Sequence, residues 1–364
     1  MTPRAERLAP EVFRLPVERI RDGYYSDAYF NYTKELLEHE GRNPHVTMQV
    51  FQRKESILGG IDEAVAILKQ CSGRRLPDGT WEEGWDALEV RALREGDAIS
   101  PWETVMTIEG PYALFAHLET VYLGPLARRT LIMRNVAEVV QAARGKPILF
   151  FPARHDHWVV QTGDGWAAHV AGAIGVSTDA QASWWGGRGV GTVPHGLIAA
   201  YGGDTVAAAR AFADRYADVM NVTVLVDFEN DSVRTALEVA AALGPKLWGV
   251  RLDTSDRLAD ESLVRVYGEE AAPKGVAPEL VRLAREELDA HGFRNVKIVA
   301  SGGFDATRIR AFEDAGVPVD SYGVGSSLIR GANDFTADVV MVDGKPCAKV
   351  GRELRPNPRL ELVR

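Results

Sequence analysis

Short strand-like runs alternate with helix-length amphipathic segments through the second half of the chain. Runs that predict strands occupy 147–151, 175–178, 191–193, 222–227, 247–252, 296–300 and 320–324. Apolar positions with helical spacing separate most of them, at 165–174, 203–219, 231–242, 277–291 and 305–315. Strands that alternate with helices of this length are typical of parallel βα units. Six or seven such units predict a (β/α) barrel, complete or incomplete, with an open doubly wound sheet as the alternative.

The first 140 residues lack this regular alternation. A strand is predicted at 46–52, and a helix begins after Gly59-Gly60 and continues to residue 70. There follow a turn-rich stretch at 71–86, two strands joined by a turn at 96–108, and helices at 112–122 and 126–144. This mixture of short elements indicates a separate α+β region.

The tail, residues 331–364, also departs from the alternation. Its segment VVMVDGKPCAKV predicts a β-hairpin with Asp343-Gly344 at the turn, because this dipeptide favours two-residue hairpin turns. We infer that the hairpin pairs with the N-terminal sheet, which makes that domain discontinuous. The expected domains are therefore 1–140, 141–330 with the βα units, and a returning tail over 331–364.

Composition and charge narrow the class of protein. The chain has 364 residues, with 42 Lys and Arg against 51 Asp and Glu, a net charge of −9. This acidity argues against general binding to nucleic acid or to a membrane surface. Cys71 and Cys347 are far apart and belong to no CxxC motif, which disfavours a disulfide framework or a cysteine-rich zinc site. The first 16 residues contain no apolar leader core and no run reaches 18 apolar residues, so we expect a cytoplasmic protein.

Polar residues and glycines gather where the predicted barrel strands end. Successive strands are followed by Arg154-His155, Thr192 to His195, Asp227, Arg251 to Asp253, Ser301 to Gly303, and Gly323 to Ser326. The active site of a βα barrel lies at the carboxyl ends of its strands. Convergence of arginine, histidine, aspartate and glycine there predicts a site for an anionic substrate.

Two glycine-rich segments suggest how a phosphate is held. SGGF at 301–304 and GVGSS at 323–327 each follow a predicted strand and precede a predicted helix. Glycine lets backbone N–H groups approach an anion closely, and a helix N-terminus adds partial positive charge. The alternative is that the glycines only form tight turns. Two consecutive loops of this kind favour a phosphate site built from Gly302, Gly303, Gly325 and Ser326.

Four charged residues at these strand ends have both a structural and a chemical interpretation. Arg251 and Asp253 alternate along a strand and so point to the same face, either as a structural pair or as ligands of phosphate, ribose or Mg²⁺-bound water. His195 is either structural, a general base or a nucleophile that accepts a phosphoryl group. Arg154 is a candidate cation for a carboxylate or phosphate. The spacing of 155–157 (His-Asp-His) suggests metal binding only weakly.

Several motifs together resemble the nicotinate phosphoribosyltransferase family. In the βα region they are GTVPHG at 191–196, VRLDTSD at 250–256, ASGGFD at 300–305 and DSYGVGSSL at 320–328. Ser26-Asp27-Ala28-Tyr29 with Thr33 resembles the family's Thr-Asp-x-Tyr-x-x-Thr opening, and FPARHDH at 151–157 its Phe-Gly-x-Arg-Arg-x-His segment. Pro346 to Lys349 resembles the Pro-x-x-Lys of its tail. These matches occur in order over nearly the whole chain.

The resemblance implies a fold and an activity. The fold is the type II phosphoribosyltransferase fold, an α/β fold with an irregular (β/α) barrel and an α/β sandwich domain formed by both chain ends. The activity joins nicotinate to 5-phosphoribosyl 1-pyrophosphate (PRPP), giving nicotinate mononucleotide and pyrophosphate in NAD salvage. ATP hydrolysis is coupled to it, Mg²⁺ accompanies the phosphates, and the enzyme is a homodimer with shared active sites.

The resemblance also assigns roles to individual residues. It makes His195, Arg251 and Asp253 catalytic, with His195 phosphorylated by ATP. It places Tyr29 on the pyridine ring from the neighbouring subunit and Arg154 near the nicotinate carboxylate. The remaining substrate-binding residues are Asp227, Thr192, Ser301, Gly302, Gly303, Gly325 and Ser326.

Three alternatives remain open. His155 stands where the family has a second arginine, which leaves nicotinamide possible, and quinolinate would require further cations such as Arg74, Arg75, Arg91 and Arg94. An unrelated phosphate-binding aldolase or isomerase barrel would need a strand-end lysine or paired carboxylates, and no strand in 222–300 ends in such a lysine. A nucleotide sensor without turnover is the third. The sequence leaves open whether Asp227 or Asp253 lies nearest to Mg²⁺.

Overall fold

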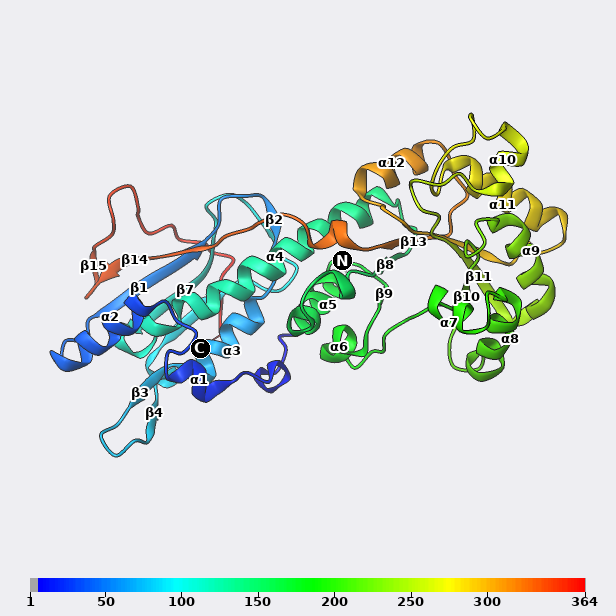
Figure 1. Cartoon of the computed structure of the whole chain (residues 1–364). Helices are drawn as coiled ribbons and strands as arrows, with labels where there is room; N and C mark the ends of the chain where they lie inside the picture. The colour runs from blue at the N-terminus through cyan, green and yellow to red at the C-terminus, as the bar shows by residue number, and fades with distance from the viewer. Residues whose placement is uncertain (1–5, 364) are drawn as a thin grey trace. The chain divides into compact units, whose positions relative to one another are not determined.

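The chain folds into two compact units in the computed structural model, which describes residues 6–363 (Figure 1). One unit combines the two chain ends, up to Arg134 and from Gly331, and the other comprises 135–330. The boundary lies within helix α4 (Glu119–Ala142). Residues 1–5, the start of the segment in which we expected no leader, lie outside the described residues.

The unit formed by the chain ends is built on a six-stranded antiparallel sheet. Its strand order is β15-β14-β1-β7-β5-β16. The strands are β1 (His45–Phe51), β5 (Glu89–Ala92), β7 (Thr104–Pro111), β14 (Thr336–Val342), β15 (Lys345–Pro346) and β16 (Glu361–Leu362). Strand β1 lies between β7 and β14, so the C-terminal segment pairs directly with an N-terminal strand. The β14–β15 turn has positive φ at Asp343 and Gly344, which suits a two-residue hairpin turn.

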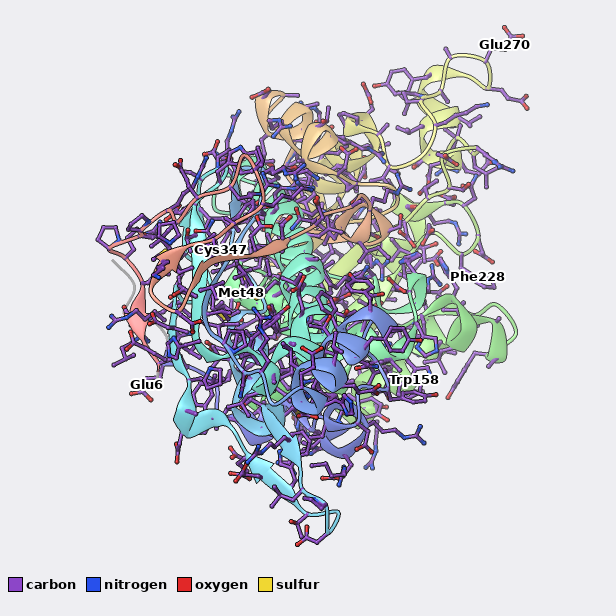
Figure 2. All side chains as sticks on the ribbon, turned by 90° about the vertical axis from the view of Figure 1, so that its left-hand side faces the viewer. Glu6, Met48, Trp158, Phe228, Glu270 and Cys347 are labelled. Atoms are coloured by element: carbon purple, nitrogen blue, oxygen red, sulfur yellow. The ribbon has the colours of Figure 1, made fainter. Side chains whose placement is uncertain are left out.

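The core of this unit lies between the sheet and helix α3 (Ile61–Cys71). Val50, Leu68 and Met106 are among its fully buried side chains. Tyr122 is buried too, and its hydroxyl lies 2.9 Å from the sulfur of Met48, which Figure 2 labels. The smaller elements are α1 (Val17–Arg21), α2 (Ala28–His39), β2 (Ser56–Ile57), β3 (Gly73–Arg75), β4 (Trp81–Glu83) and β6 (Ala98–Ile99).

The two helices expected at 112–122 and 126–144 are wrong in their boundaries. The chain forms two short 3₁₀ turns over 112–118 and then the single helix α4, which contains Pro125. Proline removes one backbone hydrogen bond and normally favours a break. Here the loop before α3 packs closely on α4, and the Gly59 N–H donates to Thr130 Oγ1 at 3.0 Å. Tertiary packing therefore outweighs the local preference for a break.

The second unit contains a parallel sheet that curls into a barrel. Its strand order is β10-β11-β12-β13-β8-β9, and all pairings are parallel. The strands are β8 (Ile148–Phe150), β9 (Gly175–Val176), β10 (Val222–Leu225), β11 (Leu247–Leu252), β12 (Lys297–Ala300) and β13 (Ser321–Val324). The last strand of the series thus pairs with the first, which excludes the doubly wound alternative and confirms the predicted fold class.

An irregular segment takes the place of a strand between β9 and β10. Val190 N–H donates to Val176 O, and Val193 N–H donates to Thr223 O. The expected strand at 191–193 is therefore reduced to one bridge, between Val193 and Val224. Glycine and proline around this segment leave it no regular ladder, because proline has no N–H to donate.

Helices surround these strands (Figure 1). They are α5 (Gln161–Val170), α6 (Asp179–Ala182), α7 (His195–Ala200), α8 (Thr205–Tyr216), α9 (Ser232–Leu243), α10 (Glu261–Tyr267), α11 (Pro278–Ala290) and α12 (Ala306–Asp314). The sequence did not predict α6, α7 or α10, which are too short to show a helical period. The helix expected after GVGSS is a single 3₁₀ turn, Ser326–Ile329. None of the helices in the described residues is long and apolar enough to cross a membrane.

Candidate active site

A cavity of about 580 Å³ lies at the carboxyl ends of the barrel strands. This volume is within the usual range for small-molecule sites. Its lining includes most residues that the sequence predicted: Arg154, Thr192, His195, Arg251, Asp253, Ser301, Gly302, Gly303, Gly325 and Ser326. Asp227 and Tyr29 are not in the lining. The βα connectivity therefore brings together residues from segments up to 172 positions apart in the chain, from Arg154 to Ser326.

Arg251, Asp253 and Ser301 form one polar network on neighbouring strands. Arg251 Nε donates to Ser301 Oγ at 2.7 Å, and Ser301 Oγ donates to Asp253 Oδ1 at 2.7 Å. Arg251 Nη2 lies 3.5 Å from Asp253 Oδ2. The Arg251 guanidinium also lies over the Phe151 ring, 5.2 Å from its centroid. Because Ser301 is 1% exposed, this hydroxyl fixes both charged groups at the cavity wall.

His195 is the first residue of α7 and pairs with a carboxylate from the loop after β10. Its Nε2 lies 2.9 Å from Asp227 Oδ1, and the Asp227 side chain is 6% exposed. The hydrogen bond to Asp227 raises the pKa of His195 above its usual value, against the opposing effect of burial. Asp253 adds to the rise and Arg251 opposes it. Asp227 thus lies behind His195 and orients its ring, whereas the sequence suggested direct substrate contact.

The SGGF loop follows β12 with a backbone that only glycine adopts easily. Gly302 and Gly303 have φ of +86° and +69°. A Cβ on Gly302 would lie 3.4 Å from Asp253 Oδ1, in van der Waals contact with the polar network. These two residues therefore allow the chain to turn tightly beside Asp253 while leaving the cavity open.

Two side chains hold the SGGF loop in place. Arg308 on α12 donates to Gly302 O at 2.6 Å and to Val276 O at 2.8 Å. Its guanidinium lies over the Phe304 ring, 4.3 Å from the centroid. Ser327 Oγ donates to Phe304 O at 2.8 Å, which joins the SGGF and GVGSS loops. The SGGF and GVGSS loops are thus held against each other at the cavity.

Three further basic side chains line the cavity. Arg154 is exposed and, within residues 6–363, has no hydrogen-bond or ion-pair partner. His155 lies beside Gly325, and Arg330 Nη2 lies 3.4 Å from Ser326 Oγ. Sequence reasoning missed Arg330 and Arg308. The signal available for Arg330 was its position directly after the GVGSS loop, and for Arg308 its position in the first turn after SGGF.

The 155–157 segment does not form a metal centre. In residues 6–363 there is no group of three or more His, Cys, Asp or Glu side chains that could hold a metal ion. His157 Nδ1 instead accepts from the Val159 N–H at 3.2 Å. Trp158 is 73% exposed, and Figure 2 shows it at the surface. The weak metal interpretation is therefore not supported.

Tyr29 lies on α2, in the unit formed by the chain ends. Its side chain is 59% exposed, and no residue of α2 is buried. Thr33 Oγ1 donates to Tyr29 O at 2.7 Å, and Asp27, the N-cap residue, accepts from Thr120 Oγ1 at 2.8 Å. The motif residues thus shape this helix locally. The stacking role of Tyr29 stays a prediction.

The fold and this cavity define a type II phosphoribosyltransferase. A family profile described as "Quinolinate phosphoribosyl transferase, N-terminal domain" matches residues 27–130. A nicotinate-nucleotide pyrophosphorylase structure from Pyrococcus furiosus is 31% identical with a TM-score of 0.78, covering 96% of this chain and 85% of that one. Nicotinate phosphoribosyltransferase pncB1 of Mycobacterium tuberculosis is 33% identical over 270 residues, 72% of this chain and 55% of the relative. The chain belongs to the nicotinate phosphoribosyltransferase family.

The chain spans about half the length of the curated relatives it matches, including 45% of the 25%-identical Bacillus subtilis nicotinate phosphoribosyltransferase. Human nicotinic acid phosphoribosyltransferase has a TM-score of 0.63 at 18% identity, covering 89% of this chain and 76% of that one, which shows a shared fold alone.

Proposed function

We propose that this protein is a nicotinate phosphoribosyltransferase, which joins nicotinate to PRPP and releases nicotinate mononucleotide and pyrophosphate in NAD salvage. The observation that carries this proposal is the cavity itself, because the Arg251–Ser301–Asp253 network, the two glycine loops and His195 line one volume. Asp227 holds His195 from behind. The 33% identity to pncB1 supports the same activity.

Each part of the cavity has a role in the transfer. The glycine loops and Arg330 bind the 5′-phosphate through backbone N–H groups and positive charge. Asp253 orients the ribose, while Arg251 faces the departing pyrophosphate. The bond from ribose C1 to the pyrophosphate oxygen breaks with its electron pair on oxygen, and the pyridine nitrogen lone pair forms the new C1–N bond. The enzyme contributes positioning and electrostatic stabilisation of the charge that develops.

Mg²⁺ fits this cavity as a companion of the substrate. Asp253 Oδ1 accepts from Ser301, while Oδ2 lies 3.5 Å from Arg251 and keeps acceptor capacity. Mg²⁺ is usually held by one or two carboxylates together with substrate phosphates. Bound Mg²⁺ would supply positive charge to the leaving pyrophosphate. We therefore assign Asp253, ahead of Asp227, as the carboxylate nearest to it, because Asp227 is buried behind His195.

His195 is the proposed acceptor for the γ-phosphoryl group of ATP. With Nε2 bonded to Asp227, Nδ1 is the nitrogen that keeps a lone pair in the neutral ring. Attack forms the Nδ1–phosphorus bond and breaks the bond to the bridging oxygen, which leaves with ADP. The ring gains positive charge, and the Asp227 carboxylate stabilises it. Hydrolysis of the phosphohistidine then releases phosphate and couples ATP to the transfer.

A quinolinate phosphoribosyltransferase is the second candidate, favoured by the family profile over 27–130. Quinolinate carries two carboxylates and so needs more cations than nicotinate. The arginines suggested for this purpose are already paired: Arg74 with Glu82, Arg75 with Asp22, Arg91 with Glu89, and Arg94 with Glu361. Arg154, without a partner in the described residues, is sufficient for one carboxylate. Nicotinamide has no carboxylate and would leave Arg154 without an anionic partner.

Parallel incubations with three pyridines test the proposal. Purified protein with PRPP, Mg²⁺ and ATP is supplied with nicotinate, nicotinamide or quinolinate, and pyrophosphate is measured. We expect release with nicotinate, and little with the other two. Release with quinolinate together with carbon dioxide would establish the second candidate. No pyrophosphate release with any of the three pyridines would leave a nucleotide-binding protein without turnover.

The assembly and location belong to the same proposal. A homodimer with shared sites would use the exposed aromatic surface of Tyr24, Tyr25, Tyr29 and Tyr32, whose side chains are 49% to 66% exposed. Tyr29 would then stack on the pyridine bound in the partner's cavity. A cytoplasmic location accords with Cys71 and Cys347, which are both free.

A further inference from the structure

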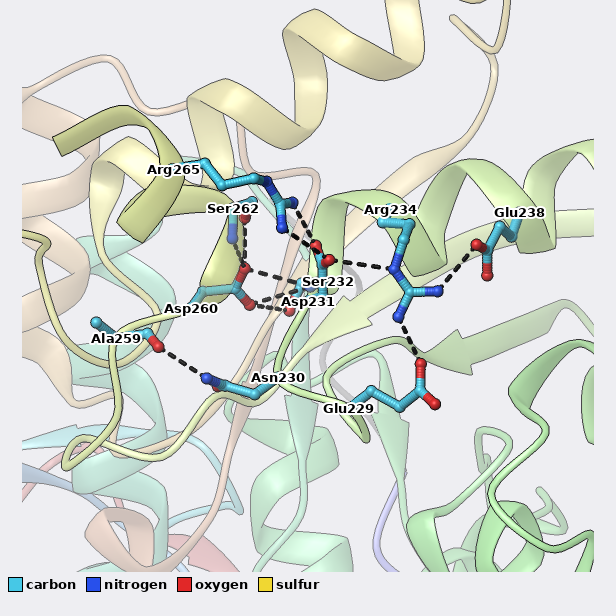
Figure 3. Close-up of polar contacts among 10 residues, drawn as sticks. All are labelled: Glu229, Asn230, Asp231, Ser232, Arg234, Glu238, Ala259, Asp260, Ser262 and Arg265. Carbon is cyan, nitrogen blue, oxygen red and sulfur yellow. Dashed lines mark hydrogen bonds and ion pairs between the residues drawn. The ribbon is translucent and has the colours of Figure 1, made fainter. Parts of the chain in front are cut away.

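A buried polar cluster joins two loops at the carboxyl end of the barrel. It contains residues from the loop after β10, residues 226–231, and from the loop after β11, residues 253–260, together with the first turns of α9 and α10 (Figure 3). Asp227 lies in the first loop and Asp253 in the second. None of the residues drawn in Figure 3 lines the cavity. An effect of the cluster on the site would therefore have to pass through the backbone of these loops.

Asp260 is the centre of this cluster. Its side chain is fully buried, at 0% exposure, and it precedes α10 as the N-cap residue. The carboxylate accepts from the Ser232 N–H at 3.1 Å and from Ser232 Oγ at 2.6 Å. It also accepts from the Ser262 N–H at 3.0 Å and from the Ser262 hydroxyl. Four donors occupy the lone pairs of one carboxylate, and they fasten the start of α9 to the start of α10.

A second pair of contacts joins the same two loops. Asn230 Nδ2 donates to Ala259 O at 2.8 Å, and the Glu261 N–H donates to Asn230 O at 2.8 Å. Asn230 has φ of +56°, a left-handed conformation that asparagine tolerates better than most residues. The Asn230 N–H donates to Asp227 O at 3.0 Å. Asn230 is thus fixed by the residues on either side of Asp260, and Asp227 lies three residues before Asn230.

Arginines close the outer side of the cluster. Arg265 donates to both oxygens of Asp231, at 3.0 and 2.7 Å, and Arg234 Nε donates to Asp231 Oδ2 at 3.1 Å. Burial acts to raise the pKa of Asp231, but these hydrogen bonds outweigh it and lower the pKa. Asp231 is consequently ionised and ties α9 to α10 a second time.

We infer that Asp260 is a positioning residue for the His195–Asp227 pair. It fixes the loop that carries Asp227, and Asp227 in turn fixes the imidazole of His195. The relevance to catalysis rests on the proposed function, in which His195 accepts a phosphoryl group. The placement of Asp227 against His195 by Asp260 is independent of the proposed function.

The protonation of His195 reports on this placement. The groups that act on its charge are Asp227, Asp253 and Arg251, and the Phe228 ring lies 6.2 Å from it. Asp227 has the largest effect, and it raises the pKa. If the 226–231 loop is released, the 2.9 Å contact lengthens and the pKa of His195 falls. Arg251 lies on β11, and Asp253 lies directly after it. Their hydrogen bonds with Ser301 do not depend on the 226–231 loop and continue to hold both residues.

The test is an NMR titration of His195 in the full chain. Asp260→Asn keeps the side-chain volume but places an N–H₂ group against N–H and O–H donors. We expect the pKa of His195 to fall by about half a unit or more, towards the ordinary 6.5. The matched control is Asp204→Asn, which makes the same change at the N-cap of α8, where Asp204 accepts from the Ala207 N–H at 2.8 Å. It should leave the pKa of His195 unchanged.

Ser232→Ala keeps the inference falsifiable if Asp260→Asn does not fold. It removes the 2.6 Å hydroxyl contact and leaves the backbone contact, so a smaller fall of the same sign is expected. An unchanged pKa in a folded Asp260→Asn protein, or in Ser232→Ala when Asp260→Asn is unfolded, overturns the inference. An equal fall in the Asp204→Asn control does so as well. Loss of thermal stability alone, without a pKa change, would mean a structural role only.

The two proposals fail in different assays. If wild-type protein releases no pyrophosphate with any pyridine, the proposed function fails and the titration still decides the role of Asp260. If the wild type is active and Asp260→Asn lowers kcat with little change in KM for PRPP, the positioning role extends to the reaction. An unchanged kcat in a variant with a lowered pKa would restrict the role to geometry.

Discussion

His195 Nε2 lies 2.9 Å from Oδ1 of Asp227, which lies in the loop after β10. The carboxylate is buried, while the imidazole lines the cavity. This arrangement selects the ring tautomer with hydrogen on Nε2, because an ionised carboxylate can only accept. It also assigns the reactive nitrogen to Nδ1. The donor nitrogen, Nε2, and the reactive nitrogen, Nδ1, are therefore fixed before any substrate binds.

Asp227→Asn should lower the pKa of His195 and slow its phosphorylation. In the wild type, acceptance of the γ-phosphoryl group requires the neutral ring, so labelling by γ-labelled ATP should increase as pH rises through the raised pKa. In the variant this increase should occur at lower pH. Its maximal rate should fall about 10²-fold or more, because the amide allows the wrong tautomer.

The measurement is acid-labile label as a function of pH, with His195→Ala as the blank. Labelling that persists in His195→Ala, or an identical pH midpoint in Asp227→Asn and the wild type, would contradict this assignment.

Asp253→Asn should lower kcat/KM for PRPP by at least about 10²-fold, since it removes a charge that acts on developing charge in the reaction. Folding should change little, because Asn Oδ1 can still accept from Ser301. The matched control is Asp320→Asn. Asp320 directly precedes β13, and its carboxylate accepts from the Ile298 N–H near the start of β12 at 2.8 Å. Steady-state kinetics and thermal unfolding measure both. Equal kinetic effects of the two variants would show that the loss is structural.

Gly302→Ala should raise KM for PRPP. Its φ of +86° costs alanine roughly 1 kcal/mol or more of stability, and the added Cβ lies 3.4 Å from Asp253 Oδ1. Gly292→Ala is the control, because Gly292 has the same φ with no atom near its Cβ position. Both variants should lose similar stability in denaturant titrations. A raised KM in both, or in neither, would remove the SGGF loop from phosphate binding.

Arg154→Met should raise KM for nicotinate about tenfold or more, because a hydrogen bond to a charged group contributes roughly 1.5–3 kcal/mol. Any turnover of nicotinamide should be unaffected or improved, since that pyridine has no carboxylate to pair. Arg210→Met, at an exposed position on α8, is the control for loss of one positive charge. An unchanged KM for nicotinate would shift the carboxylate contact to another cation of the cavity, such as Arg330.

The barrel could be predicted because its strands are buried on both sides and therefore form continuous apolar runs. Val222 to Leu225 and Lys297 to Ala300 coincide with such runs to within two residues at each end. The bonding of 190–193 could not be predicted. It depends on backbone contacts to Val176 and Thr223, which leave no periodic trace in the sequence.

The residues of the cavity could be predicted better than their partners. Arg251 and Asp253 are two positions apart, so their shared face follows from strand geometry. His195 and Asp227 are 32 positions apart, and the parallel bridge between Val193 and Val224 brings their segments together. Arg308 was missed because its contact is a hydrogen bond to a backbone carbonyl, Gly302 O. The sequence does not distinguish an arginine with such a contact from a solvent-exposed arginine on a helix. The Asp260 cluster was missed for the same reason, since its serines resemble ordinary N-terminal helix residues.

The decisive measurement is the conversion of labelled nicotinate by the wild-type protein and by Asp253→Asn. We propose that the cavity at the carboxyl ends of the strands joins nicotinate to PRPP. With PRPP, Mg²⁺ and ATP present, we predict that the wild type forms nicotinate mononucleotide and pyrophosphate in equal amounts, and that Asp253→Asn forms at most about a hundredth as much per unit time. No nicotinate mononucleotide from the wild type, or equal formation by the two proteins, would contradict it.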